Sequence, residues 1–213
     1  MIVSLTGFMG CGKSSVGRIL SELLCCPFVD LDDAISERAG RSIPEIFAAE
    51  GESYFRGLER ETLADIIRSH SSDDSSARLI LALGGGAVMT QACERMVHEE
   101  TLCIYLKASV DTLISHLEGQ AAGRPLLNTS AMPSASVMSS EPPSVMSSEP
   151  PSVMSSEPPS VMSSEVETSP LRKRILELMS LRAETYERTA HHIIDTDGKT
   201  IADISSEILD IIS

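Results

Sequence analysis

The stretch SLTGFMGCGKSSVG, residues 4–17, constrains the possible fold more strongly than any other part of this chain. Its central part, GFMGCGKS, matches the spacing G-x-x-x-x-G-K-[ST]. The apolar run IVSLT (2–6) precedes the glycines, and apolar residues at helical spacing follow them between residues 13 and 25. A strand that passes through a glycine loop directly into a helix is typical of the first unit of a parallel α/β fold.

The residue types in this loop suit a bound phosphate group. Glycines let the backbone approach an anion with N–H groups pointing inward, and the helix that follows adds its positive N-terminal end. Lys13 provides a cation for the outer phosphates, and the Ser14 hydroxyl can bind Mg²⁺. Cys11 is either a small residue that fills the loop or a redox-sensitive thiol. The motif predicts a nucleotide but not a reaction, because GTPases, ATPase motors and small-molecule kinases all contain it.

Further apolar runs alternate with helical patterns along the chain. Continuously apolar strands separated by helices favour a parallel sheet that is buried on both faces, as in a three-layer α/β sandwich. A length of 213 residues is sufficient for one such domain. The predicted strands are 2–6, 27–31, 78–83, 101–106 and 191–195.

The composition excludes several classes of partner. The formal net charge of −14 disfavours nucleic acids and anionic membrane surfaces, because both require clustered basic residues. No apolar run approaches the ~20 residues that span a bilayer, and the first residues lack the pattern of a secretion signal. The five cysteines have neither metal-site nor disulfide spacing. We therefore expect reduced thiols and a cytoplasmic protein.

Residues 128–169 interrupt the α/β pattern. They contain seven of the eleven prolines and no Lys or Arg, and from Ser136 the octapeptide SVMSSEPP repeats in register. Because Pro-Pro pairs fit neither helix interiors nor central strands, we expect a disordered insertion, which costs a fold little to close. The repetition indicates tandem duplication without a function of its own. An interaction tail and a phosphorylated serine tract are the alternatives.

Three acidic residues, Asp30, Asp32 and Asp33, lie where the second predicted strand ends, at the sheet edge where ligands bind in such folds. Alternation along an extended chain places Asp30 and Asp32 on the same side. Their carboxylates could hold Mg²⁺-bound water and accept a proton from a hydroxyl group. In a second interpretation, Asp32 or Asp33 caps a helix that begins at Ala34, which leaves the other carboxylates available.

Two further signals indicate a bound ligand, and one of them suits a carboxylate group. Arg56 follows two aromatic residues in a predicted helix, and a partly buried guanidinium suits a carboxylate, although an arginine among acids is more often a surface charge. Ser42 and Glu45 have the spacing of a capping box at the start of that region. The triple glycine 84–86 follows the third predicted strand and either forms a plain turn or lets the backbone approach a ligand closely.

Taken together, these motifs resemble the shikimate kinase family. That family has a loop GxMGxGKS, a D-x-D after its second strand and the stretch GRSIxEIFxxxGExxFRxxE; this chain has GFMGCGKSSVG, Asp30-Leu31-Asp32 and GRSIPEIFAAEGESYFRGLE. The family also has a triple glycine, a lid RPLL, found here at 124–127, and a late helix with Arg and Tyr, found here at Arg182 and Tyr186. The resemblance covers the whole chain except about residues 128–169.

The resemblance implies a fold and a reaction. The fold is a nucleoside-monophosphate-kinase-like domain over residues 1–213, with a five-stranded parallel sheet in the order 2-3-1-4-5 and the insertion 128–169 in the lid. The reaction is ATP- and Mg²⁺-dependent phosphorylation of the 3-hydroxyl of shikimate, which gives shikimate 3-phosphate and ADP in chorismate and aromatic amino acid biosynthesis. The resemblance also implies a monomer.

The resemblance assigns roles to individual residues. Catalytic roles fall to Lys13, Asp32 and Arg124, and the Mg²⁺ site to Ser14, with Asp30 acting through water. The ATP phosphates are held by Gly10, Cys11, Gly12, Lys13, Ser14, Ser15 and Arg124. Shikimate is bound by Asp32, Arg56, Gly84, Gly85, Gly86 and Arg182.

The chain departs from the family pattern at two places. Where the family usually has a second basic residue in the helix before the lid, this chain has only His116, which predicts a weaker contact with adenine or phosphate. The repeat also follows the lid motif directly, so it could slow lid closure. Another small-molecule kinase and a nucleotide-binding regulator without catalytic activity remain the alternative functions.

Overall fold

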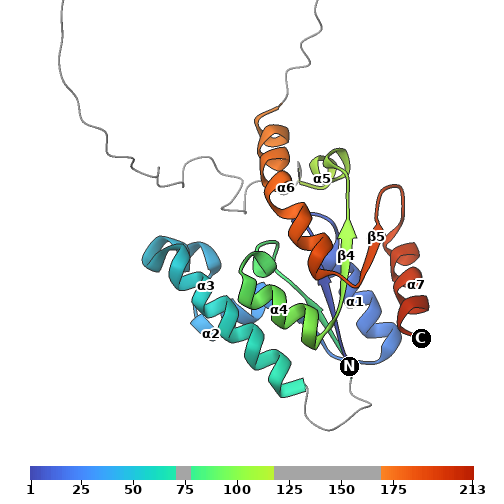
Figure 1. Ribbon diagram of the computed structural model, residues 1–213, viewed down its shortest axis with the longest axis horizontal. Coiled ribbons are helices and arrows are strands. Elements are labelled where there is room, and N and C mark those ends of the chain that lie inside the picture. Colours follow the sequence, from blue (N-terminus) through green and yellow to red (C-terminus); the bar gives the residue numbers. More distant parts are fainter. Residues whose placement is uncertain (71–77, 118–168) are drawn as a thin grey trace, which may run out of the picture.

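The computed structural model describes residues 1–70, 78–117 and 169–213, and in these ranges it contains one five-stranded sheet (Figure 1). All strand pairs are parallel, and the strand order is β2-β3-β1-β4-β5. The predicted order is therefore confirmed, and each observed strand end lies within one residue of its predicted position. The strands are β1 Ile2–Thr6, β2 Phe28–Asp30, β3 Leu79–Ala82, β4 Leu102–Lys107 and β5 His192–Asp195.

Helices connect the strands and cover both faces of the sheet, which confirms the predicted three-layer arrangement (Figure 1). They are α1 Lys13–Leu24, α2 Leu31–Ala39, α3 Ile43–His70, the 3₁₀ turn η1 Ala87–Met89, α4 Gln91–Glu100, α5 Val110–Leu117, α6 Pro170–Thr189 and α7 Ile201–Ile212.

The central strands place alternate side chains in two separate apolar clusters. In β1, Val3 and Leu5 pack with α1, α5 and α7 on one face, whereas Ile2 packs with α2, α3 and α4 on the other. This alternation follows from the pleat of a strand, and burial of both faces explains why these strands are continuously apolar. The edge strand β5 differs, because only Ile194 of its four residues is buried.

Helix α6 contributes to both clusters. Its first half places Ile175 and Leu178 in the cluster on the α1 face, and its second half places Tyr186 in the cluster on the α3 face. The helix therefore spans the two layers and reaches the loop after β3 from the side.

The two described helices that flank residues 118–168, α5 and α6, contact each other. An ion pair joins Asp111 of α5 to Arg172 of α6. The predicted insertion 128–169 falls almost wholly outside the described residues, as does Arg124.

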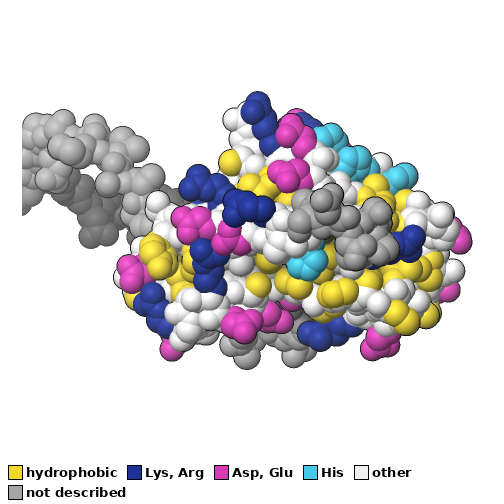
Figure 2. All heavy atoms as spheres, turned by 90° about the horizontal axis from the view of Figure 1, so that it is seen from below, with side chains coloured by type: hydrophobic (Ala, Val, Ile, Leu, Met, Phe, Trp, Pro, Cys, Tyr) yellow, Lys and Arg dark blue, Asp and Glu magenta, His cyan; other side chains and the backbone are white. Residues whose placement is uncertain are grey.

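Two further predictions concern the surface and the cysteines. The five cysteines are free thiols. Exposed basic side chains lie among acidic ones on the face drawn in Figure 2. Several basic side chains of the described residues are paired with acidic ones, such as Arg38 with Asp65 at 2.6 Å. Among the described helices, none is both long and apolar enough to cross a membrane.

Close packing of α1 on β2 depends on a glycine in the helix. A Cβ atom on Gly17 would lie 2.4 Å from Cε2 of Phe28, which is far inside van der Waals contact. Since Phe28 begins the strand that ends at Asp30, this contact sets how closely α1 lies beside β2.

We expect Gly17→Ala to lower the free energy of unfolding by about 1–3 kcal/mol, because the added methyl group must displace the Phe28 ring. Gly57→Ala is the matched control, since a Cβ atom there meets nothing within 4 Å, and it should raise the free energy of unfolding by up to about 1 kcal/mol through helix propensity. Urea denaturation followed by circular dichroism measures both. Equal effects of the two substitutions would contradict the tight contact.

Candidate functional site

A cavity of about 630 Å³ opens at the carboxyl ends of the first three strands. Its walls come from the loop after β1, the start of α2 and the loop after β3, and α5 and α7 each add one side chain. Topology brings these segments together, because parallel strands end at the same edge of a sheet. The lining residues are Met9, Gly10, Gly12, Lys13, Ser14, Ser15, Asp30, Asp32, Asp33, Leu83, Gly84, Gly85, Gly86, His116 and Ile201.

The glycine loop forms the end of the cavity at α1. Gly12 precedes the helix with φ 95°, a left-handed conformation that favours glycine, and no side chain caps the first N–H groups of α1. Uncapped N–H groups and the helix dipole together form a site for an anion. The glycine loop and the uncapped start of α1 thus lie together, as the motif predicts.

Lys13 and Ser14 both line this part of the cavity. The Lys13 ammonium folds back over the loop and donates hydrogen bonds to the carbonyl oxygens of Gly7 and Phe8, both at 2.9 Å. The Ser14 hydroxyl donates to the Asp30 carboxylate at 2.7 Å. The structure thus brings together the Ser14 hydroxyl, predicted to bind Mg²⁺, and the Asp30 carboxylate, predicted to act through water, and oxygen groups of this kind suit that ion.

The capping role predicted for Asp32 or Asp33 is wrong. Helix α2 begins at Leu31, and Asp30 caps it by accepting a hydrogen bond from the Asp32 N–H at 3.1 Å. Because Asp30 can cap the helix, the chain turns helical directly after β2, and Asp32 lies in the first turn rather than on an extended segment. The alternation argument therefore fails, although Asp30 and Asp32 do line the same cavity.

Two glycines of the triplet 84–86 leave space that a polar side chain occupies, and the third lies within van der Waals distance of another. A Cβ atom on Gly84 would lie 2.5 Å from an Asp32 carboxylate oxygen, and one on Gly86 would lie 2.8 Å from both terminal nitrogens of Arg56. A Cβ atom on Gly85 would lie 3.9 Å from Nη1 of Arg182. The three predicted acceptor-binding side chains thus come from α2, α3 and α6 and meet at one loop.

A break in α3 positions Arg56. The helix is interrupted at Gly51, where φ is 80° and ψ is 179°, and the rings of Phe47 and Phe55 pack across this break with centroids 4.7 Å apart. Arg56 follows a little more than one turn after the break, and only 19% of its side chain is exposed. Phe55 is therefore a core residue that holds the next residue, Arg56, beside the glycines.

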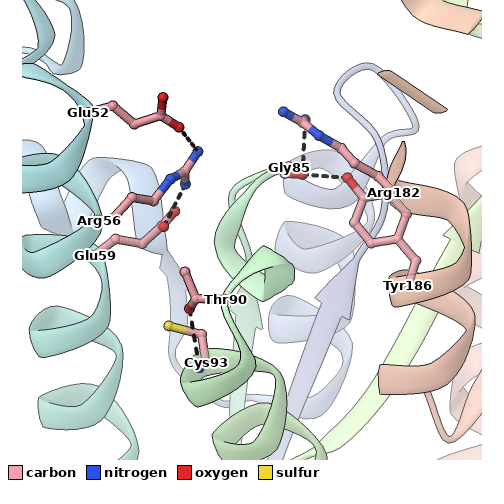
Figure 3. A network of polar contacts seen from close by, with 8 residues as sticks. All are labelled: Glu52, Arg56, Glu59, Gly85, Thr90, Cys93, Arg182 and Tyr186. Atoms are coloured by element: carbon pink, nitrogen blue, oxygen red, sulfur yellow. Dashed lines mark hydrogen bonds and ion pairs between the residues drawn. The ribbon is translucent and has the colours of Figure 1, made fainter. Parts of the chain in front are cut away.

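Glu59 is a residue that the sequence analysis missed. Its carboxylate pairs with Arg56 Nη1 at 2.7 Å and is only 2% exposed, whereas Glu52 pairs with Nη2 at 3.4 Å and is 67% exposed (Figure 3). Burial raises the pKa of Glu59 above that of an ordinary glutamate, although Arg56 acts in the opposite direction. Its spacing of three residues from Arg56 was the available signal, but sequence alone could not distinguish a buried partner from a surface pair.

Arg182 lies on the opposite side of the glycine loop from Arg56 (Figure 3). It is 8% exposed, and its Nη1 donates to the Gly85 carbonyl oxygen at 3.2 Å. Tyr186, one turn further along α6, donates its hydroxyl hydrogen to the same oxygen. The sequence analysis noted Tyr186 as part of a motif and did not foresee this contact.

His116 occupies the wall of the cavity near the glycine loop. Its Nδ1 lies 2.8 Å from the Gly10 carbonyl oxygen, which makes Nδ1 the protonated ring nitrogen in this contact. The sequence analysis considered His116 only as a weak replacement for a basic residue. The observed contact joins α5 to the glycine loop.

Comparison with known proteins supports the same assignment as the geometry. Residues 9–145 match the sequence model of the family described as "Shikimate kinase". The chain belongs to the shikimate kinase family. The family named from the sequence is thereby confirmed.

Individual shikimate kinases extend this comparison. The chain is 48% identical to the shikimate kinase of Salinibacter ruber over 127 residues, which cover 60% of this chain and 59% of that protein. It is 29% identical to the shikimate kinase of Dictyoglomus turgidum over 210 residues, or 98% and 95% of the two chains. The first match thus spans about six tenths of its relative's length.

A solved structure shares both fold and sequence with this chain. The shikimate kinase from Acinetobacter baumannii in complex with shikimate superposes with a TM-score of 0.72 at 27% identity, covering 99% of this chain and 92% of that one. The predicted fold class of the family is therefore confirmed.

We expect Glu59→Gln to lower the free energy of unfolding by about 1–3 kcal/mol, because the largely buried Arg56 guanidinium loses its charged partner. Glu52→Gln removes the exposed partner of the same guanidinium and should change it by less than about 0.5 kcal/mol. Urea denaturation at neutral pH compares the two variants. If Glu52→Gln proved the more costly change, the buried carboxylate would not be what anchors Arg56.

Proposed function

We propose that this chain transfers the γ-phosphate of ATP to the 3-hydroxyl of shikimate, giving shikimate 3-phosphate and ADP. The observation that carries this proposal is the meeting of Asp32, Arg56 and Arg182 at the glycine triplet, beside the anion site at the start of α1. Membership of the shikimate kinase family supports it. The relative solved with shikimate supports the identity of the acceptor.

The proposed nucleotide site uses the glycine loop. Backbone N–H groups at the start of α1 bind the ATP phosphates, and the Lys13 ammonium moves from the loop carbonyls onto the transferred group. Ser14 would bind Mg²⁺ and Asp30 would hold it through water; when bound, this ion offsets negative charge on the phosphates. The phosphate contacts of this site are assigned to Gly10, Cys11, Gly12, Lys13, Ser14, Ser15 and Arg124.

The proposed acceptor site uses charge on both sides of the glycine triplet. Arg56 and Arg182 bind the shikimate carboxylate, since guanidinium groups match a carboxylate in shape and charge. Asp32 accepts a hydrogen bond from a ring hydroxyl and takes its proton as the phosphoryl group transfers. Gly84, Gly85 and Gly86 let the ring approach the backbone closely.

Catalysis then rests on position and charge. Holding the hydroxyl in line with the γ-phosphate converts an encounter between two substrates into a step within one complex. Lys13 and Arg124 stabilise the charge that spreads over the transferred oxygens. We further propose that the chain acts as a monomeric cytoplasmic enzyme of one domain, in which residues 128–169 are an insertion that is not needed for activity.

The test is ADP release from Mg-ATP by the purified full-length chain, with and without shikimate. We expect release that depends on shikimate and exceeds that with other carboxylated alcohols. A Lys13→Ala variant with an unchanged circular dichroism spectrum should release none. Two results would rule out this acceptor and favour another kinase or a regulator. One is equal ADP release without shikimate, and the other is no ADP release although ATP is bound.

We expect Arg56→Ala to raise KM for shikimate at least about tenfold, which corresponds to about 1.4 kcal/mol of lost binding. Arg68→Ala, on the same helix with a side chain that is 75% exposed, serves as the control and should leave KM unchanged. Steady-state kinetics at saturating ATP measures both constants. An unchanged KM in Arg56→Ala would remove Arg56 from the carboxylate site.

A further inference from the structure

The carbonyl groups of the glycine triplet are all engaged by the protein. The Gly84 and Gly86 carbonyl oxygens accept hydrogen bonds from the N–H groups of Ala87 and Met89, each at 3.1 Å. The Gly85 carbonyl oxygen accepts from two side chains of α6, Arg182 and Tyr186 (Figure 3). Every acceptor of the triplet therefore has a partner.

The N–H groups of Gly85 and Gly86 differ from the carbonyl groups. Within the described part of the chain, the N–H groups of Gly85 and Gly86 donate no hydrogen bond to another residue. In a planar trans peptide the N–H points opposite to the C=O. Two side chains of α6 hold the Gly85 carbonyl, so the Gly86 N–H of the same peptide points away from α6. The glycine triplet itself lines the cavity.

Tyr186 is well placed to hold this peptide rigidly. The residue is fully buried, and its ring packs against that of Tyr105 with centroids 5.2 Å apart. Burial raises the pKa of the Tyr186 hydroxyl, so the group remains a protonated donor at neutral pH. Because packing holds the ring, the hydroxyl oxygen is held beside the Gly85 carbonyl.

The two donors to Gly85 differ in what else they can do. Arg182 has further N–H groups, and under the proposed function its guanidinium also binds the acceptor carboxylate. If Arg182 shifts toward that ligand, its 3.2 Å contact with Gly85 weakens. The Tyr186 hydroxyl also interacts with the Arg182 guanidinium, but its ring is fully buried, so it can keep the peptide in place while Arg182 binds the ligand.

We infer that Tyr186 is a positioning residue for the acceptor: its hydroxyl fixes the Gly85–Gly86 peptide so that the Gly86 N–H is presented to an oxygen of the bound acid. This inference rests on the proposed function for the identity of that acid. It concerns the acceptor half of the cavity, because the Tyr186 hydroxyl donates its hydrogen bond to the loop after β3.

The experiment compares Tyr186→Phe with Tyr105→Phe, which removes a hydroxyl from the neighbouring ring in the same cluster. We expect Tyr186→Phe to raise KM for shikimate by about three- to tenfold, with KM for ATP changed by less than about twofold. Tyr105→Phe should leave both constants unchanged. A rise in both KM values, or no rise in either, would show a merely structural hydroxyl and overturn the inference.

A second readout does not depend on turnover. In the ¹⁵N-labelled chain without ligands, we expect Tyr186→Phe to shift the Gly86 amide signal, while Tyr105→Phe leaves it in place. If the wild-type chain releases no ADP with shikimate, the proposed function fails and this signal alone decides the inference. An unshifted Gly86 signal in Tyr186→Phe would overturn the inference, whatever the activity of the chain.

Discussion

The site depends on one steric constraint, which is that residues 84–86 have no side chains. Asp32 and Arg56 lie where a Cβ atom on Gly84 or Gly86 would be at 2.5–2.8 Å, so even alanine would push them away. The carbonyl of Gly85 is meanwhile held by two residues of α6. Three helices thus converge on a loop that is only backbone, and the polar groups between them stay at fixed positions.

The sheet topology makes this convergence possible. Strand β1 lies between β3 and β4, and β2 lies beyond β3, so the loops after β1, β2 and β3 end side by side. One loop carries an uncapped helix start for an anion, the next carries carboxylates, and the third carries the glycines. Under the proposed function, the phosphate donor and the hydroxyl acceptor therefore share one cavity.

Much of this arrangement was predictable from local sequence. The glycine loop specified its strand, its turn and its helix, and the apolar runs located all five strands to within one residue. The failures have physical causes. Asp30 caps α2 because it lies at the end of β2, directly before the helix. The burial of Glu59 and the hydrogen bond of Tyr186 depend on which helices pack together. Contacts between distant elements produce no periodic pattern in a single sequence.

Helix α6 links the acceptor site to the cooperativity of the whole domain. Its first half is packed in one apolar cluster and its second half in the other, so it cannot detach from one layer without disturbing both. Local unfolding in proteins usually involves elements with few buried contacts. The arginine and tyrosine that border the acceptor side are instead carried by an element anchored in both layers. Fluctuations that expose these two side chains should therefore require near-global unfolding, which keeps this half of the cavity formed before any ligand arrives.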